Sequence, residues 1–144
     1  MKRYILTIIL CLLATKLVAK DIYYDDICIT KNDIRRIYDG DTFYVDIPAY
    51  PDIAGKNIGI RINALDTPEI RTRNQEEKHK AIQSRNYLAK LFNQSNKITL
   101  KKVKRGKYFR YVADVYVDGQ NVAKIMTKKG YGYAYFGGTK KGEK

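Results

Sequence analysis

The residues Ile37-Tyr38-Asp39-Gly40-Asp41-Thr42-Phe43-Tyr44-Val45 form the stretch of sequence on which the predicted fold is built. The dipeptide Asp39-Gly40 favours a tight hairpin turn, and apolar residues flank it on both sides. We therefore predict two short β-strands that meet at this turn, with the strand pattern beginning at Asp33. Pro48 and Pro51 follow and indicate a loop after the second strand.

Further along the chain, strand patterns and helix patterns alternate. Ile58, Ile60, Ile62 and Ala64 fall on one face of a strand, whereas Arg61 falls on the other face. The segment 75–94 repeats its apolar residues with the period of a helix and carries a strongly charged opposite face. The same patterns predict further strands over 98–103 and 111–117, and a short helix over 122–129 that Asn121 caps.

The predicted elements are about five short strands, with one helix inserted among them and one helix after the last strand. This order fits a small closed or nearly closed antiparallel β-barrel with helices. The OB-fold, a five-stranded Greek-key barrel, is the common version that binds nucleic acid. The chain of 144 residues has room for one such domain. Residues 20–32 are mixed in composition and are expected to be a lead-in to it.

The charge balance points to a polyanionic partner. The chain contains 28 Lys and Arg residues against 15 Asp and Glu residues, which gives a formal net charge of +13. Such an excess favours binding to nucleic acid or to an anionic membrane surface. The 13 tyrosines suit stacking on single-stranded bases, although most of them are expected to be ordinary strand and core residues.

The N-terminus has the pattern of an export signal. Met1-Lys2-Arg3 is a positive segment, and the apolar run from Tyr4 to Leu13 has the length of a signal-peptide core. Cleavage after Ala19 would make residues 1–19 a signal peptide and residues 20–144 the mature domain, with its core at about 33–136. The protein is therefore expected to be exported, either periplasmic or secreted. An uncleaved membrane anchor is the second interpretation. It ranks second because Lys16 interrupts the apolar stretch and leaves it short for a membrane span.

Removal of the signal would also remove Cys11 and leave Cys28 as the single thiol of the mature domain. One thiol cannot form an internal disulfide, so the domain is expected to hold together by packing alone. The same removal takes away Lys2, Arg3 and Lys16 and lowers the formal charge to +10.

Several acidic residues stand out against this basic background because they lie at predicted turns. Asp41 closes the Asp-Gly-Asp turn, and Asp66 follows the strand that carries Arg61. Two strand ends that meet at one edge of a barrel could bring both carboxylates onto a single cation, and Ca²⁺ accepts an irregular shell of oxygen ligands. Each motif alone is explained as well by an ordinary turn, so the metal-site hypothesis depends on their combination.

Cleavage of a phosphodiester needs the residue types found in these motifs. Water must attack phosphorus while negative charge builds up on the phosphate oxygens, and a divalent cation and bidentate arginines stabilise that charge. A nearby carboxylate can orient or deprotonate the water. The chain offers one such set, which consists of Asp41, Arg61, Asp66, Thr67, Glu69 and Arg110.

The order and approximate spacing of these motifs resemble those of the thermonuclease, or staphylococcal nuclease-like, family. The resemblance rests on the segment 37–42, then Arg61, then Asp66-Thr67-Pro68-Glu69, and then Lys107-Tyr108-Phe109-Arg110, and it covers roughly residues 33–136. It implies an OB-type barrel and Ca²⁺-dependent cleavage of DNA, with RNA as a further substrate. Such cleavage has little sequence specificity and leaves 3′-phosphate ends.

The resemblance also implies a role for each matching residue. Asp41 and Asp66 would be carboxylate ligands of calcium, and Thr67 would add its backbone carbonyl. Glu69 would match the carboxylate proposed as the general base.

Arg61 and Arg110 would be the phosphate-clamping arginines, with Arg110 also placed to assist the leaving oxygen. Lys107 and Tyr108 would line the nucleotide site, together with a second tyrosine that is either Tyr133 or Tyr135. One departure is Phe109, because the family commonly has glycine at this position, so the loop before Arg110 is expected to sit differently.

Two other functions remain open at this point. A non-catalytic OB-type module that grips single strands would explain the charge, but it would not need the acids and both arginines. A basic protein that binds anionic lipid or cell-wall polymer would explain the charge and the signal and would leave the same residues without a purpose. No stable protein partner is implied, and a monomer is expected.

Overall fold

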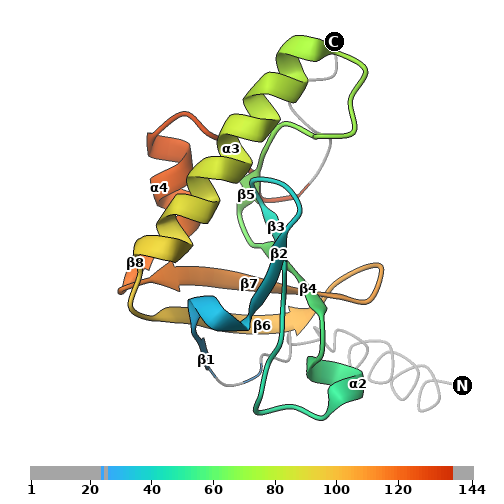
Figure 1. Cartoon of the computed structure of the whole chain (residues 1–144), viewed down its shortest axis with the longest axis vertical. Helices are drawn as coiled ribbons and strands as arrows, with labels where there is room; N and C mark the ends of the chain where they lie inside the picture. Colours follow the sequence, from blue (N-terminus) through green and yellow to red (C-terminus); the bar gives the residue numbers. More distant parts are fainter. Residues whose placement is uncertain (1–23, 25, 138–144) are drawn as a thin grey trace, which may run out of the picture.

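The computed structural model describes residues 24 and 26–137, so the predicted signal peptide lies outside the described residues. Its main sheet is curled and has the strand order β1-β6-β7-β4-β3-β2, with the short β8 paired to β7 (Figure 1). A second sheet pairs β5 with β9. The strands are β1 (Ile27–Ile29), β2 (Ile34–Ile37), β3 (Thr42–Val45), β4 (Ile58–Ile62), β5 (Leu65–Asp66), β6 (Ile98–Arg105), β7 (Arg110–Val117), β8 (Gln120–Asn121) and β9 (Tyr133–Ala134).

The curled sheet with its helices agrees with the predicted β-barrel with helices. Its principal strands β2, β3, β4, β6 and β7 are the ones that the sequence patterns predict. The expectation of a wholly antiparallel barrel was wrong, because β4 runs parallel to β7 with Gly59 opposite Arg110. Parallel neighbours need a crossover connection, and the segment between β4 and β7, which contains a helix and β6, provides it.

The helices are α2 (Asp52–Gly55), α3 (Gln75–Gln94) and α4 (Val122–Lys128), and a 3₁₀ turn η1 (Lys31–Asp33) precedes β2. The bounds of α3 confirm the predicted helix. It begins where it does because the Asn74 side chain accepts hydrogen bonds from the backbone N–H groups of Glu76 (2.9 Å) and Glu77 (3.2 Å). Asn121 caps α4 in the same way. Among the described residues, no helix is long and apolar enough to cross a membrane.

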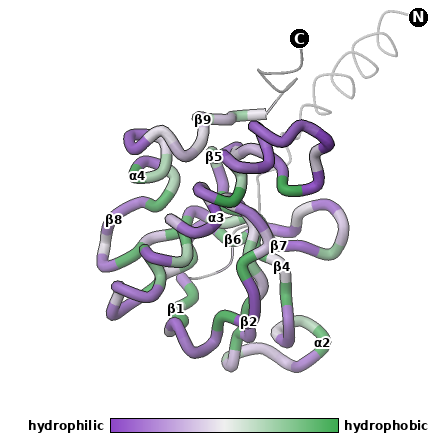
Figure 2. Tube along the Cα trace, turned by 45° about the horizontal axis from the view of Figure 1, so that its top comes forward, coloured by the Kyte–Doolittle hydropathy of each residue, from purple (hydrophilic) through white to green (hydrophobic). Residues whose placement is uncertain are grey.

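The hydrophobic core lies between the curled sheet and α3, and α4 covers the sheet beside α3 (Figure 1). Phe43 of β3 and Phe92 of α3 are both fully buried and meet edge to face, with ring centroids 4.9 Å apart. Figure 2 shows hydrophobic segments in the strands and mainly hydrophilic turns around them. Buried residues alternate with half-buried ones along β7, which confirms the strand predicted over 111–117 and places one of its faces on the core.

Two local features differ from the sequence prediction. The lead-in contains a strand, β1, which pairs with β6 and buries Ile27 and Ile29 at the edge of the core. The strand predicted to reach Ala64 ends earlier, at Ile62, because the chain turns at Ala64, whose φ is 59°. This turn directs the chain into β5.

Gly40 joins the β2–β3 turn to the rest of the fold. A Cβ at this position would lie 2.7 Å from the Ser84 Cβ in α3 and 2.9 Å from the Thr67 Cγ2. The sequence predicts glycine here for its turn conformation, whereas the structure also requires it for space. The close approach holds the turn that carries Asp41 against both α3 and the residue after β5.

Gly40→Ala should therefore destabilise the protein. The added methyl group overlaps two packed side chains, so we expect a loss of roughly 1–3 kcal/mol in the free energy of unfolding. Gly119→Ala is the control, because nothing lies within 4 Å of a Cβ there and only the positive φ of +82° is penalised. The control should cost about 1 kcal/mol. Urea unfolding of both variants measures the difference, and equal losses would contradict the packing role of Gly40.

Candidate active site

A pocket of about 860 Å³ opens where the β2–β3 turn, β4, the segment after β5 and the β6–β7 loop meet. Every residue of the predicted site lines this one pocket, although the residues come from four separate segments. They are Asp41, Arg61, Asp66, Thr67, Glu69, Lys107, Tyr108 and Arg110. The structure thus brings the predicted side chains together, while their individual roles stay predictions.

Asp41 lies at the buried end of the pocket, with only 1% of its surface exposed. Its Oδ2 accepts hydrogen bonds from the Thr67 backbone N–H (3.0 Å) and the Thr67 hydroxyl (3.1 Å). Its Oδ1 accepts one from the Thr42 hydroxyl (2.8 Å) and one from Arg61 Nη1. The carboxylate is therefore fixed by donors from three different segments.

The guanidinium of Arg61 joins the two predicted metal-ligating carboxylates. Besides Asp41, it contacts Asp66, whose Oδ1 accepts a hydrogen bond from Nη2 at 2.9 Å. Nη2 also donates to the Leu65 backbone carbonyl at 3.2 Å, which ties the arginine to β5. Because the guanidinium is planar and its donors lie in a fixed geometry, the two carboxylates are held on either side of one positive charge.

Burial raises the pKa of the Asp41 carboxyl to about 7. The neighbouring Asp39 carboxylate contributes to this rise, whereas the Arg61 guanidinium opposes it, and the pKa of about 7 is the net result. Asp39 also lines the pocket, and its Oδ1 accepts a hydrogen bond from the Asp41 N–H at 3.3 Å. Asp39 had no role in the sequence-based prediction, although its position in the Asp-Gly-Asp motif, two residues before Asp41, could have indicated that it lies in the site.

The donor chemistry of the pocket fits a hard cation. Two carboxylates, from Asp41 and Asp66, already converge on one centre of positive charge, the Arg61 guanidinium. Within the described ranges, no group of three or more His, Cys, Asp or Glu side chains could hold a metal ion. A cation here would therefore need backbone carbonyl and water ligands as well, which is the kind of irregular oxygen shell that Ca²⁺ accepts.

Arg110 enters the pocket from the first position of β7. Its side chain lies over Gly59 of β4, where a Cβ would come within 3.2 Å of the Arg110 Cγ. The Nε of Arg110 is buried and has no hydrogen-bond partner among the described residues. A buried donor without a partner is costly, so this atom is suited to an anionic ligand that enters the pocket.

The loop before Arg110 adopts a strained conformation. Tyr108 and Phe109 have φ angles of 57° and 56°, in the left-handed region that favours glycine. Phe109 is the position where the resemblance leads one to expect glycine, so the loop keeps a glycine-type conformation with a larger residue. The Arg105 guanidinium lies 4.0 Å from the centre of the Phe109 ring and packs the ring against the loop.

The remaining predicted residues lie at the open rim. Glu69 and Lys107 are exposed, and Tyr108 is 86% exposed with its ring 5.8 Å from the Arg110 guanidinium. Of the two C-terminal tyrosines that the sequence left open, Tyr135 lines the pocket. Tyr133 instead pairs with Asp66 in the β5–β9 sheet and is 65% exposed.

Sequence reasoning missed three aromatic and basic residues of the pocket wall, which are Tyr38, Tyr44 and Arg71. The sequence contained a signal for Tyr44. Successive residues of a strand point to opposite faces, so Tyr44 lies on the outer face of β3 when Phe43 lies on the inner one. Arg71 follows the Asp-Thr-Pro-Glu motif, where nothing in the spacing distinguishes it from the many other basic residues.

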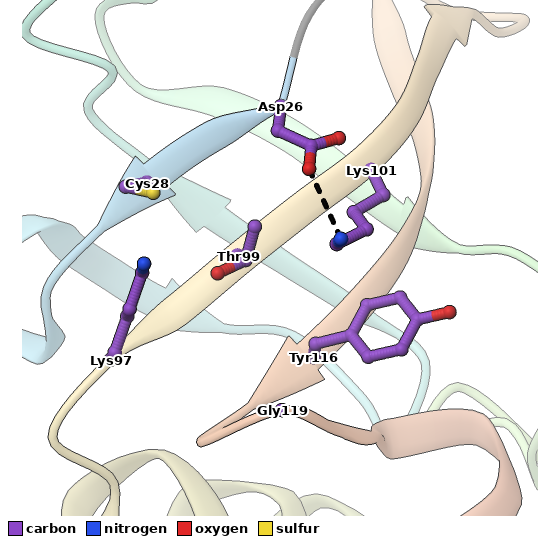
Figure 3. Close-up of a pocket in the computed structure, with 7 residues that line it drawn as sticks. All are labelled: Asp26, Cys28, Lys97, Thr99, Lys101, Tyr116 and Gly119. Carbon is purple, nitrogen blue, oxygen red and sulfur yellow. Dashed lines mark ion pairs between the residues drawn. The ribbon is translucent and has the colours of Figure 1, made fainter.

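A second, shallower hollow of about 360 Å³ lies on the outer face of β1, β6 and β7 (Figure 3). Asp26 and Lys101 form an ion pair across it at 3.1 Å, and the exposed Cys28 lies at its edge. No residue of the predicted site lines this hollow.

Without a cation, Asp41 should make the fold less stable as the pH rises. Its native pKa of about 7 exceeds the value of about 3.9 for an unfolded aspartate, so the native state binds the extra proton. The stability that protonated Asp41 contributes is complete below about pH 4 and is lost as the pH rises through 7. In EDTA, Asp41→Asn should therefore remove up to about 3 kcal/mol from the fall in unfolding free energy between pH 5 and 8.

Urea unfolding at the two pH values measures this difference. Asp118→Asn, at an exposed turn, is the matched control and should leave the pH dependence of the parent protein in place. If Asp41→Asn and the parent lose the same free energy over this interval, Asp41 does not carry the raised pKa.

Comparison with known proteins adds one finding. A family model described as staphylococcal nuclease homologue matches residues 59–144, from Gly59 in β4 to the end of the chain. The matched part includes Arg61, Asp66, Glu69 and Arg110, whereas Asp41 precedes it. No curated protein matches the chain. Because the match covers more than half of the chain and the family domain is an OB-fold, the chain belongs to the staphylococcal nuclease homologue family.

Proposed function

We propose that the protein is a calcium-dependent nuclease that hydrolyses DNA and RNA with little sequence specificity and leaves 3′-phosphate ends. The family is typically one of nucleases, and its domain implies a nucleic-acid ligand. The observation that carries the proposal is the pair of carboxylates held by Arg61, in the same pocket as the Arg110 Nε, which has no hydrogen-bond partner among the described residues.

Asp41, Asp66 and the Thr67 backbone carbonyl are the groups that would hold Ca²⁺. When bound, the cation would supply positive charge to the phosphate and orient it for attack. With both carboxylates neutralised in this way, Arg61 can direct its donors to a phosphate oxygen. The family is generally Ca²⁺-dependent, which supports calcium over other divalent cations.

Glu69 is the proposed general base. Its carboxylate lies at the open rim of the pocket, where water reaches it. Glu69 would take a proton from the water that attacks phosphorus, while the bond between phosphorus and the 5′-oxygen breaks. The departing 5′-oxygen would accept a hydrogen bond from Arg110 and take up a proton from solvent to become the 5′-hydroxyl, and the phosphate would remain on the 3′-oxygen. Arg61 and Arg110 would stabilise the charge that builds up on the other phosphate oxygens.

Lys107, Tyr108 and Tyr135 would hold the nucleotide beside the reacting phosphate, because they line the same rim. An exposed ring such as that of Tyr108 can stack on any base, which agrees with low sequence specificity. We also propose that the nuclease is exported and acts as a monomer. The N-terminal residue of the exported protein, expected to be Lys20, would test the cleavage site.

Glu69→Gln and Arg110→Gln test the proposed chemistry. Loss of a general base should lower kcat by a factor of about 10²–10⁴. Loss of the charge-stabilising arginine should lower kcat by about 10²–10³. Both changes lie at exposed or half-buried positions, so the unfolding free energy should change little. Initial rates on a single-stranded DNA substrate with calcium measure the effects.

Glu76→Gln and Arg85→Gln are matched controls, because both positions lie on α3 and neither lines the pocket. They should cleave at the parent rate. Full activity of Glu69→Gln would exclude Glu69 as the base. Tight oligonucleotide binding without cleavage by the parent protein would favour a single-strand-binding module instead. In that case, the Arg61 ion pairs would serve only to fold the turn.

A further inference from the structure

A row of cross-strand neighbours extends from Arg110 to the far edge of the sheet. Arg110 on β7 is opposite Gly59 on β4, Gly59 is opposite Tyr44 on β3, and Tyr44 is opposite Arg36 on β2. Directly opposed residues of neighbouring strands share one face of the sheet. Arg36 therefore lies on the same face as Arg110, although no sequence motif connects them.

A β-bulge in β2 places Arg36 on this face. The register passes from Ile34 opposite Val45 to Arg36 opposite Tyr44, so β2 has one extra residue, Arg35. In a regular pairing Arg36 would share the inner face of Ile34, and its charge would point toward the core. Bulges re-aim side chains in this way and are frequent next to functional sites.

Gly59 leaves the row open at its centre. A Cβ there would lie 3.2 Å from the Arg110 Cγ and 3.5 Å from the Tyr44 Cε1. The Tyr44 and Arg110 side chains therefore both approach the space that a side chain at position 59 would fill. Three strand spacings of roughly 4.8 Å separate β7 from β2, which is about 14 Å along the sheet. A row of this length is longer than one nucleotide of a single strand, so its two ends can bind different phosphates.

The β2 end of the row is a cluster of two arginines and two tyrosines. The Arg36 guanidinium lies 4.4 Å from the Tyr44 ring centroid and 5.8 Å from that of Tyr38. The Arg71 guanidinium lies 5.5 Å from the Tyr38 ring centroid. Tyr38, Tyr44 and Arg71 also line the active-site pocket. Arginines held against aromatic rings keep N–H donors available for a phosphate.

The charges of this cluster are not neutralised locally. In the part of the chain that the structure describes, neither Arg36 nor Arg71 forms an ion pair. Arg35, the adjacent residue, is paired with Asp46. Arg36 and Arg71 are both exposed, so they are positioned to bind an anion from solution.

We propose that Arg36 and Arg71, held by Tyr38 and Tyr44, form a second phosphate-binding subsite for a single-stranded nucleic acid. It lies across β4 and β3 from Arg110 and takes a phosphate other than the one that is cleaved. The inference rests on the proposed nuclease function, because it assumes that the scissile phosphate lies between Arg61 and Arg110. It predicts that substrates long enough to reach β2 bind more tightly than short ones.

Binding of fluorescein-labelled oligothymidylates to the full chain in EDTA tests the subsite without cleavage. For an octamer, Arg36→Gln should weaken binding several-fold and lower the slope of log K against log salt by about 0.7, the value for one lost phosphate contact on a single strand. A dinucleotide should bind Arg36→Gln and the parent equally. Arg71→Gln should behave like Arg36→Gln.

Arg35→Gln is the matched control, because it removes the same charge from the adjacent position. It should keep the parent's salt slope on the octamer. An identical effect of Arg35→Gln and Arg36→Gln would reduce the cluster to general positive charge and overturn the subsite. An equal loss on the dinucleotide and the octamer would overturn it as well, since the cluster would then act at the cleaved phosphate.

Cleavage in calcium separates this inference from the proposed function. On the octamer, Arg36→Gln should raise KM several-fold with little change in kcat. If the parent does not cleave, but Arg36→Gln still lowers the salt slope, the nuclease function fails and the phosphate contact stands. If the parent cleaves and Arg36→Gln has the KM of Arg35→Gln, the function stands and the subsite fails.

Discussion

The contact of one guanidinium, that of Arg61, with both Asp41 and Asp66 is the interaction on which the rest of the site depends. It connects the β2–β3 turn to β5 through a side chain of β4, so three segments are fixed relative to one another. A carboxylate as buried as that of Asp41 would be strongly unfavourable without such a partner. Thr67 completes the arrangement with two further hydrogen bonds to the same carboxylate.

Without a bound cation, this arrangement lowers the stability of the fold at neutral pH. The close packing around Gly40 keeps Asp41 out of water, and burial together with Asp39 raises its pKa. A cation that replaced the proton would remove the unfavourable charge, so binding of calcium and folding should stabilise each other. The strained backbone of Tyr108 and Phe109, directly before Arg110, also costs stability. Such strain is tolerated where the surrounding contacts fix a functional side chain.

Much of the fold could be predicted because its signals are local. The bounds of α3 followed from apolar periodicity, and strand β7 followed from its alternating pattern. The parallel pairing of β4 with β7 could not be predicted in this way, because it depends on a crossover of long sequence separation. Strand β1 was missed because three residues give too short a pattern, and its burial is supplied by β6.

The site residues could be proposed from the sequence because the motifs are dense in acids and arginines at turns. The geometry of these residues could not be predicted in the same way. Periodicity does not reveal that Tyr135 reaches the pocket while Tyr133 pairs with Asp66, since the two tyrosines are only two residues apart and have the same place in an alternating pattern. Nor does it reveal the bulge at Arg35, which turns Arg36 outward into line with Tyr44 and Arg110.

The most direct measurement is cleavage of single-stranded DNA and RNA by residues 20–144, with calcium or with EDTA, followed by identification of the end groups. We expect fragments only with calcium, and we expect each to carry a 3′-phosphate and a 5′-hydroxyl. The same cleavage in EDTA, or 5′-phosphate ends, would contradict a site in which Asp41 and Asp66 hold a cation and Arg110 faces the departing 5′-oxygen.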